Sequence, residues 1–197
     1  MAKRPSNIRN NIIDSALDCA SELDWGKVSL LMISERASIT LDRLYSYFPS
    51  KTIIAGAIFD RTTGMVMTKT RPSVSNEPVR DRLLDNILQR FDAMEGHKAA
   101  IASIIRDTKF DPLAVCYLVP KLFDSMAWTL EMSGISSAGL VGRMRVKGLT
   151  LVYLSTLNIW VNDDSPDLTK TMAFLDRRLK QALQFASILP FPILDKH

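Results

Sequence analysis

Residues 28–51 read VSLLMISERASITLDRLYSYFPSK, and this stretch decides the fold. It holds two short amphipathic segments separated by a turn at residues 38–39, and Pro49 closes the second segment. The segments begin with Ser and Thr, which cap helix N-termini, and proline cannot continue a helix. The stretch therefore predicts a helix over 29–37, a tight turn and a helix over 40–48, which is the outline of a helix-turn-helix.

Apolar residues recur at helical spacing along almost the whole chain, so the predicted fold class is all-α. A helix is predicted over 8–23, ended by Gly26 as a left-handed cap, and another over 50–69, capped by Ser50. Residues 71–78, with two prolines, are the predicted linker. Further helices are predicted at Val79–Glu95, Lys98–Arg106, Leu113–Met132 with a kink or split at Pro120, Leu140–Val161 and Leu168–Leu189. We divide the chain into a helix-turn-helix head, residues 1–56, and a helical body, residues 57–197.

The composition is that of a folded globular protein, with 197 residues, 47% of them apolar, and a net charge of +4. The first eleven residues lack the apolar core of a secretory signal, so a cytoplasmic protein is expected. Cys19 and Cys116 have no partner spacing and are predicted to be buried packing residues. With two histidines, no phosphate loop and no nucleophile elbow, we expect no enzyme, cofactor or metal. Helix capping explains Asp163, Asp164 and Asp167 better than a metal site does.

The head resembles a known family in the residue types at certain positions and in the spacing between them. These residues are Gly26, Val28, Ile33, Ala37, Ile39-Thr40, Leu44-Tyr45 and Tyr47-Phe48-Pro49-Ser50-Lys51. This pattern is similar to the DNA-binding head of TetR-family transcriptional regulators, over about residues 8–60 and most closely in LYSYFPSK. The resemblance implies double-stranded DNA as a partner, and an all-helical body that dimerises and binds a small ligand.

By this similarity, the second helix of the motif would present polar side chains to the DNA. Arg43 and Tyr47 are the candidates for base or groove contacts, and Lys51 with the amides behind Ser50 for a phosphate. The predicted DNA-binding residues are Thr40, Asp42, Arg43, Ser46, Tyr47, Lys51, Arg4 and Arg9, and Lys3 could add a backbone contact from the same N-terminal arm.

The alternative for the head is a purely structural unit of three packed helices. The turn position usually held by Gly in the family is Ser38, and Asp42 places a carboxylate on the face that would meet phosphates. Residues 1–56 carry seven basic and six acidic side chains, a difference of only +1. A DNA-binding head is usually more basic.

The body carries a second resemblance, in NDDSPDLTKTMAFLDRRL at residues 162–179 and in the preceding region 126–160. These residues are similar to the lipid-binding accessory protein of ubiquinone biosynthesis, which has a TetR-type fold but is associated with isoprenoid lipids. A well-capped amphipathic helix also explains Ser165, Pro166 and Asp167. The alternative function is therefore a lipid-binding accessory protein with an inactive head.

The body is expected to bind a small apolar or lipid-like ligand that releases the protein from a palindromic operator. The candidate pocket residues are Met94, Phe123, Met126, Trp128, Met132, Tyr153 and Trp160, although most Met and aromatic residues at helical spacing are core residues. A homodimer is expected through Leu168–Leu189 and part of Leu140–Val161. The apolar tail after Leu189 could cover the body, pack on a second subunit or contact a membrane surface weakly.

Overall fold

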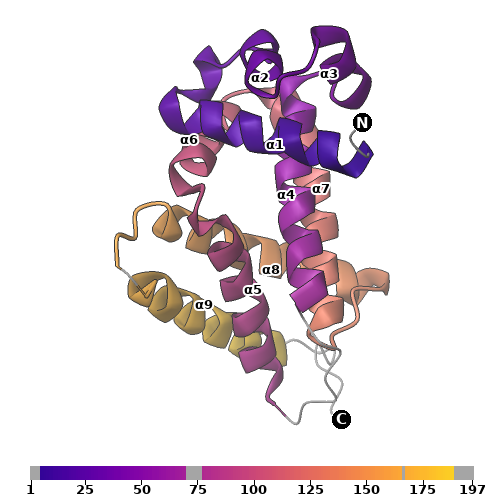
Figure 1. Cartoon of the computed structure of the whole chain (residues 1–197). Helices are drawn as coiled ribbons and strands as arrows, with labels where there is room; N and C mark the ends of the chain where they lie inside the picture. The colour runs from indigo at the N-terminus through magenta and orange to yellow at the C-terminus, as the bar shows by residue number, and fades with distance from the viewer. Residues whose placement is uncertain (1–4, 70–76, 166, 189–197) are drawn as a thin grey trace. The chain divides into compact units, whose positions relative to one another are not determined.

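The computed structural model describes residues 5–69, 77–165 and 167–188, and its regular elements in these ranges are helices, with no strand among them. The prediction of an all-α chain is confirmed. In chain order the elements are α1 (Pro5–Glu22), the 3-10 turn η1 (Trp25–Lys27), α2 (Leu30–Arg36), α3 (Leu41–Tyr47), α4 (Lys51–Lys69), α5 (Val79–Glu95), α6 (Lys98–Thr108), α7 (Pro112–Met132), α8 (Gly139–Trp160) and α9 (Thr169–Ile188) (Figure 1).

Every predicted helix is present, and its observed ends lie within three residues of the predicted ones. One local prediction is wrong. Gly26 does not adopt a left-handed conformation, because η1 follows α1 and the positive-φ glycines of the described residues are Gly134 and Gly139. Helix α7 continues through Pro120, so the predicted split is absent, and the alternative of a kink there stays a prediction. Because Pro120 is exposed, water can satisfy the carbonyl group that loses its helical hydrogen bond. The predicted linker lies mostly outside the described residues, and so does the apolar tail.

The chain folds into two compact units. Unit 1 contains residues 1–62 and 94–121, and unit 2 contains residues 63–93 and 122–197, each within the described ranges. The chain passes between the units within α4, α5 and α7. Residues of α6 thus belong to the same compact unit as the helix-turn-helix. The division at residue 56 remains a prediction about the DNA-binding segment.

Unit 1 is built on α1, whose apolar side packs against α2 and α6. The periodicity of α1 explains this packing, because its apolar positions recur every three or four residues and form one stripe. The largest fully buried apolar side chains of residues 5–48, which contain α1, α2 and α3, are Ile12, Ile13, Leu17, Ile33, Leu44 and Phe48. Their burial stabilises the packing of α1, α2 and α3.

Unit 2 is a bundle in which α8 and α9 run along each other (Figure 1). Its core contains Phe91 of α5, which stacks on Tyr153 with ring centroids 5.5 Å apart and on Trp160 at 5.4 Å. Aromatic contacts of this kind add to the apolar burial of the rings. They join α5 to α8.

Helix α7 is apolar, but only part of it is buried. It is the one described helix that is long and apolar enough, by length and composition, to cross a membrane, with a mean hydropathy of 1.2 and 28% of that window buried. Cys19 is buried as predicted, but Cys116 of α7 is exposed, so that half of the cysteine prediction is wrong. The spacing of apolar residues on a helix does not by itself tell which of them face the core.

Candidate functional site

The turn of the helix-turn-helix has the geometry that the spacing predicts. The Ser29 side chain caps α2 by accepting a hydrogen bond from the Met32 N–H at 3.1 Å. Ser38 has φ +53°, in the left-handed region that favours glycine. This conformation explains why the family that the motif resembles usually places Gly there. Serine holds it at a cost of about 1 kcal/mol.

Helix α3 has one buried and one open side. Leu44 and Phe48 are fully buried, whereas Thr40, Asp42, Arg43 and Ser46 are exposed and Tyr47 is half-buried. The structure thus brings these five predicted contact residues together at the surface of one short helix. Thr40 is the N-cap residue of α3, but its hydroxyl does not cap the helix.

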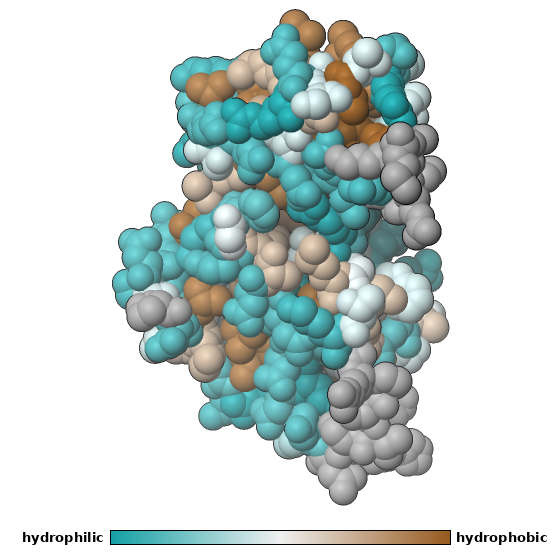
Figure 2. Space-filling model, in the orientation of Figure 1, coloured by the Kyte–Doolittle hydropathy of each residue, from teal (hydrophilic) through white to brown (hydrophobic). Residues whose placement is uncertain are grey.

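Two exposed side chains of α3 are missing from the predicted set, Leu41 and Tyr45. Tyr45 is 65% exposed, and apolar residues are visible at the surface of the α2–α3 segment at the top of Figure 2. The sequence holds the signal, because Leu44 and Phe48 are one helical turn apart and define the buried side. A residue next to Leu44 then points away from that side.

Asp42 has a local role that accounts for a carboxylate on this surface. Its carboxylate accepts hydrogen bonds from the Thr40 hydroxyl, which is the main cause of a lowered pKa, and from the backbone N–H groups at the start of α3. Acidic residues are favoured in the first turn of a helix, where the backbone N–H groups carry partial positive charge. The Asp42 carboxylate therefore stabilises the first turn of α3.

The basic residues of the head differ in what they contact. Arg36 forms a bidentate ion pair with Glu22, with one nitrogen–oxygen distance of 2.6 Å. The guanidinium of Arg9 lies 4.8 Å from the centre of the Phe48 ring. Arg43 forms no ion pair or side-chain hydrogen bond within the described residues, so its guanidinium is open to a partner. Arg4 lies outside the described residues.

Lys51 has an internal partner. Its ammonium donates a hydrogen bond to the Trp25 carbonyl and lies 4.8 Å from the centre of the Trp25 ring. Burial lowers the pKa of Lys51, and the charge of Asp107 opposes that effect. The ammonium predicted to hold a phosphate thus anchors η1 to the start of α4.

Lys51→Met should therefore destabilise the protein. It removes a charged hydrogen bond and a cation–π contact, with an expected loss of about 1–2 kcal/mol in the free energy of unfolding. The melting temperature should fall by about 2–4 °C for each kcal/mol. Lys27→Met is the control, because Lys27 pairs with Asp24 at the exposed surface and its loss should change stability by less than about 0.5 kcal/mol. An unchanged melting temperature, with a shallower salt dependence of DNA binding, would support the phosphate contact predicted for Lys51 over the structural role.

Residues of α6 hold η1 in place within unit 1. The Trp25 N–H donates to Ser103 Oγ at 2.8 Å, and the Gly26 N–H donates to Asp107 Oδ2 at 2.5 Å. Arg106 pairs with Asp24 at 2.9 Å. Three consecutive positions before the helix-turn-helix are therefore tied to one helix.

The predicted pocket residues differ in their burial and in the compact unit to which they belong. Tyr153 and Trp160 both stack on Phe91 in unit 2. Met126 is buried and Phe123 and Met132 are half-buried in that unit, whereas Met94 is buried in unit 1. Trp128 is exposed. It lines an open surface hollow of about 400 Å³ with Asp124, Ala127, Glu131 and Ser137.

Arg90 is not among the residues predicted from the sequence, and it is one of the largest fully buried side chains. Its position holds a signal, because Leu83, Ile87, Arg90 and Met94 are spaced by four, three and four residues on α5. An arginine on the apolar stripe of an amphipathic helix is unusual and points to an internal partner.

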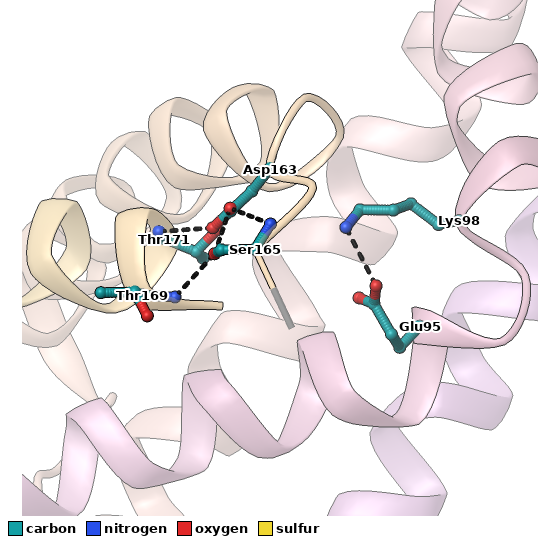
Figure 3. A network of polar contacts seen from close by, with 6 residues as sticks. All are labelled: Glu95, Lys98, Asp163, Ser165, Thr169 and Thr171. Atoms are coloured by element: carbon teal, nitrogen blue, oxygen red, sulfur yellow. Dashed lines mark hydrogen bonds and ion pairs between the residues drawn. The ribbon is translucent and has the colours of Figure 1, made fainter. Parts of the chain in front are cut away.

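Asp163 organises the connection from α8 to α9 (Figure 3). Its Oδ2 accepts hydrogen bonds from the Thr171 N–H at 2.8 Å and the Thr171 hydroxyl at 2.7 Å, and its Oδ1 accepts from the Ser165 N–H at 3.0 Å and the Ser165 hydroxyl. Ser165 Oγ in turn accepts from the Thr169 N–H at 3.0 Å. The predicted capping hydroxyl is therefore present, and the buried carboxylate behind it was not foreseen. Pro166, predicted at the first helical position, lies outside the described residues.

Solved structures similar to this chain include TetR-type regulators. A TetR transcriptional regulator from Nitrosomonas europaea is 24% identical, with 89% of this chain and 98% of that chain covered and a TM-score of 0.75. One from Rhodococcus sp. RHA1 is 18% identical, with coverages of 90% and 97% and a TM-score of 0.69. One from Streptomyces coelicolor is 19% identical, with coverages of 95% and 84% and a TM-score of 0.65. The chain therefore has the TetR-type fold that its head motif predicts.

The COQ9 family model matches residues 145–186, which comprise most of α8 and α9 and the Asp163 connection. No curated protein gives a significant match. Both resemblances noted in the sequence are thus found again, one across the whole fold and one in this segment. The segment match is similarity over two packed helices of the TetR-type fold.

Proposed function

We propose that the protein is a DNA-binding transcriptional regulator of TetR type, most simply a repressor. The observation that carries this proposal is the exposed side of α3, where Arg43 forms no ion pair with any described residue and lies beside exposed Ser46 and half-buried Tyr47. A recognition helix needs such side chains at its surface to contact base edges. Two heads of a dimer would contact the half-sites of a palindrome whose centres are about 34–36 Å apart.

The dimer would form through α8 and α9. Helix α8 has exposed apolar side chains at Leu140, Met144, Leu151 and Leu154, which share one face at helical spacing. Met172 adds an exposed apolar side chain on α9, which packs along α8. Exposed apolar faces of this kind on paired helices favour a four-helix interface between two copies.

Ligand binding in the body would alter the distance between the two heads and release DNA. The contacts of α6 with η1 support this mechanism, because a displacement of α6 would carry the turn before the helix-turn-helix with it. The ligand predicted from the sequence is small and apolar. As a non-enzymatic DNA-binding protein it would act in the cytoplasm.

Sequencing genomic fragments retained by the purified protein tests DNA binding directly. We expect an enriched palindromic motif. Arg43→Ala should then relax the preference at one base pair of each half-site, at a cost of about 1–3 kcal/mol. Arg36→Ala is the control, because Arg36 is held by Glu22 and should leave base preference unchanged. Equal weakening on all sequences would assign Arg43 to the DNA backbone.

The second candidate is a lipid-binding accessory protein with an inactive head. The COQ9 match over residues 145–186 favours it. This function requires no operator, so failure to enrich any palindrome at moderate salt would support it over the first proposal. Stable association with isoprenoid-containing vesicles would be its positive result.

A further inference from the structure

Arg90 of α5 is a buried cation without an anionic partner among the described residues that contact it. The residue is 1% exposed. Its Nη2 donates to the Thr63 hydroxyl at 3.0 Å and to the Ser125 hydroxyl, and its Nη1 lies 3.4 Å from the Thr129 hydroxyl. All three partners are neutral. Buried arginines usually pair with a carboxylate, because an uncompensated charge in a protein interior costs several kcal/mol.

Two buried polar atoms beside this cluster, Arg90 Nε and the Tyr153 hydroxyl, have no hydrogen-bond partner in the described part of the chain. The guanidinium lies 5.6 Å from the centre of the Tyr153 ring, so both groups belong to one region of unit 2. Each of these groups can donate a hydrogen bond. Burying such a donor without an acceptor lowers the stability of the folded protein by about 1–3 kcal/mol. The region therefore has unused donors and one unbalanced positive charge.

The surroundings of these donors are apolar and aromatic. Phe91 stacks on both Tyr153 and Trp160, with an interplanar angle of 9° to the tyrosine. Ile87 and Met126 are fully buried in the same unit. Side chains of this kind accommodate hydrocarbon, and methionine adapts to irregular shapes.

We propose that the core of unit 2 binds the carboxylate of an amphipathic monocarboxylic acid, with Arg90 and Tyr153 at the carboxylate and the aromatic side chains along the hydrocarbon. This inference rests on the ligand-binding part of the proposed function and changes the class of its ligand from apolar to amphipathic and anionic. One carboxylate oxygen accepts from the guanidinium and the other from the Tyr153 hydroxyl. The Thr63 and Ser125 hydroxyls, 2.8 Å apart, both accept from Nη2 and hold the guanidinium in place.

The balance of charge selects a carboxylate over a phosphate. Arg90 supplies a single positive charge, and a carboxylate returns a single negative one. A phosphate monoester carries about −1.5 to −2 charges at pH 7 and three acceptor oxygens. Its second charge would remain buried without a cation among the residues that contact Arg90, which is unfavourable.

The test uses the full chain without DNA and a series of straight-chain carboxylic acids from hexanoate to tetradecanoate, below their critical micelle concentrations. Each acid is compared with the alcohol and the alkyl phosphate of the same length, by calorimetric titration and by thermal melting. We expect at least one acid to bind saturably and at least about tenfold more tightly than its alcohol, from a charged hydrogen bond. Arg90→Met should reduce this preference to within about twofold, and Tyr153→Phe should reduce it partly.

Arg90→Met keeps the volume and removes the charge, so the variant is expected to fold and even to be more stable than the wild type. A wild-type protein that binds no acid more tightly than the matched alcohol overturns the proposal. So does a preference that persists in Arg90→Met, or one that favours the phosphate. Because DNA is absent, these outcomes leave the operator-binding proposal untouched, and failure to bind an operator would leave the carboxylate site untouched.

Discussion

Leu151→Glu should convert the proposed dimer into a monomer in sedimentation or light-scattering measurements. Leu151 lies in the middle of the exposed apolar face of α8 and is 70% exposed in the single chain. A carboxylate in an apolar interface loses its hydration, at a cost of several kcal/mol per copy. The dissociation constant of the dimer should rise at least about 100-fold, which corresponds to about 2.7 kcal/mol.

The affinity for DNA should fall when the dimer dissociates. Two heads on one palindrome bind as a linked pair, whereas a monomer contacts only a half-site. Affinity for the full operator should therefore drop by at least about 100-fold at protein concentrations below the new dissociation constant. Binding to an isolated half-site should remain unchanged.

Leu113→Glu is the matched control for this change. Leu113 of α7 is 82% exposed and belongs to unit 1, away from the proposed α8–α9 interface in sequence. The same substitution there should leave the dimer and operator binding as in the wild type. A Leu151→Glu protein that remains dimeric, or a Leu113→Glu protein that dissociates, would show that the dimer uses another face.

The helices of this chain could be predicted because local signals define them. The bounds of α5 match the predicted Val79–Glu95, and Ser29 and Ser50 cap the helices that they were expected to cap. Apolar periodicity, capping residues and proline all act within about one helical turn. The open side of α3 follows from the same periodicity, so most of its predicted contact residues are at the surface.

The contacts of long side chains could not be predicted, because they depend on partners far along the chain. Lys51 reaches Trp25, and Arg90 reaches hydroxyls on α4 and α7. Trp128 and Cys116 look like core residues in the sequence but lie on the surface of α7. A helical wheel gives the relative positions of side chains on one helix, and the neighbours of the helix decide which side is buried.

Asp163→Asn should destabilise the protein by about 3 kcal/mol, the largest effect on stability that we expect from a polar substitution. Asp163 is 1% exposed, and its two oxygens accept four hydrogen bonds from Ser165 and Thr171. Asparagine has the same shape but a single acceptor oxygen, and its NH₂ group would face donors. Two buried donors would therefore lose their acceptor. Thermal or urea unfolding measures the loss.

The dependence of this effect on pH identifies the carboxylate as its origin. Burial opposes ionisation of Asp163, but the hydrogen bonds from Ser165 and Thr171 outweigh it and hold the pKa of Asp163 well below its ordinary 3.8. The contribution of the ionised group is therefore fully present above the pKa of the unfolded chain and is lost as the pH falls below about 4. The difference in stability between wild type and Asp163→Asn should be constant from pH 6 to 8 and should shrink below about pH 4.

The neighbouring Asp164 supplies the control for both measurements. Asp164 is exposed, so Asp164→Asn should change the free energy of unfolding by less than about 0.5 kcal/mol at any pH. If Asp163→Asn were as stable as Asp164→Asn, the connection from α8 to α9 would be held by the apolar contacts of Leu168 and Leu175 alone. Helix packing alone would then stabilise residues 145–186, the segment that resembles COQ9. The Asp163 carboxylate would contribute only to the local shape of the loop.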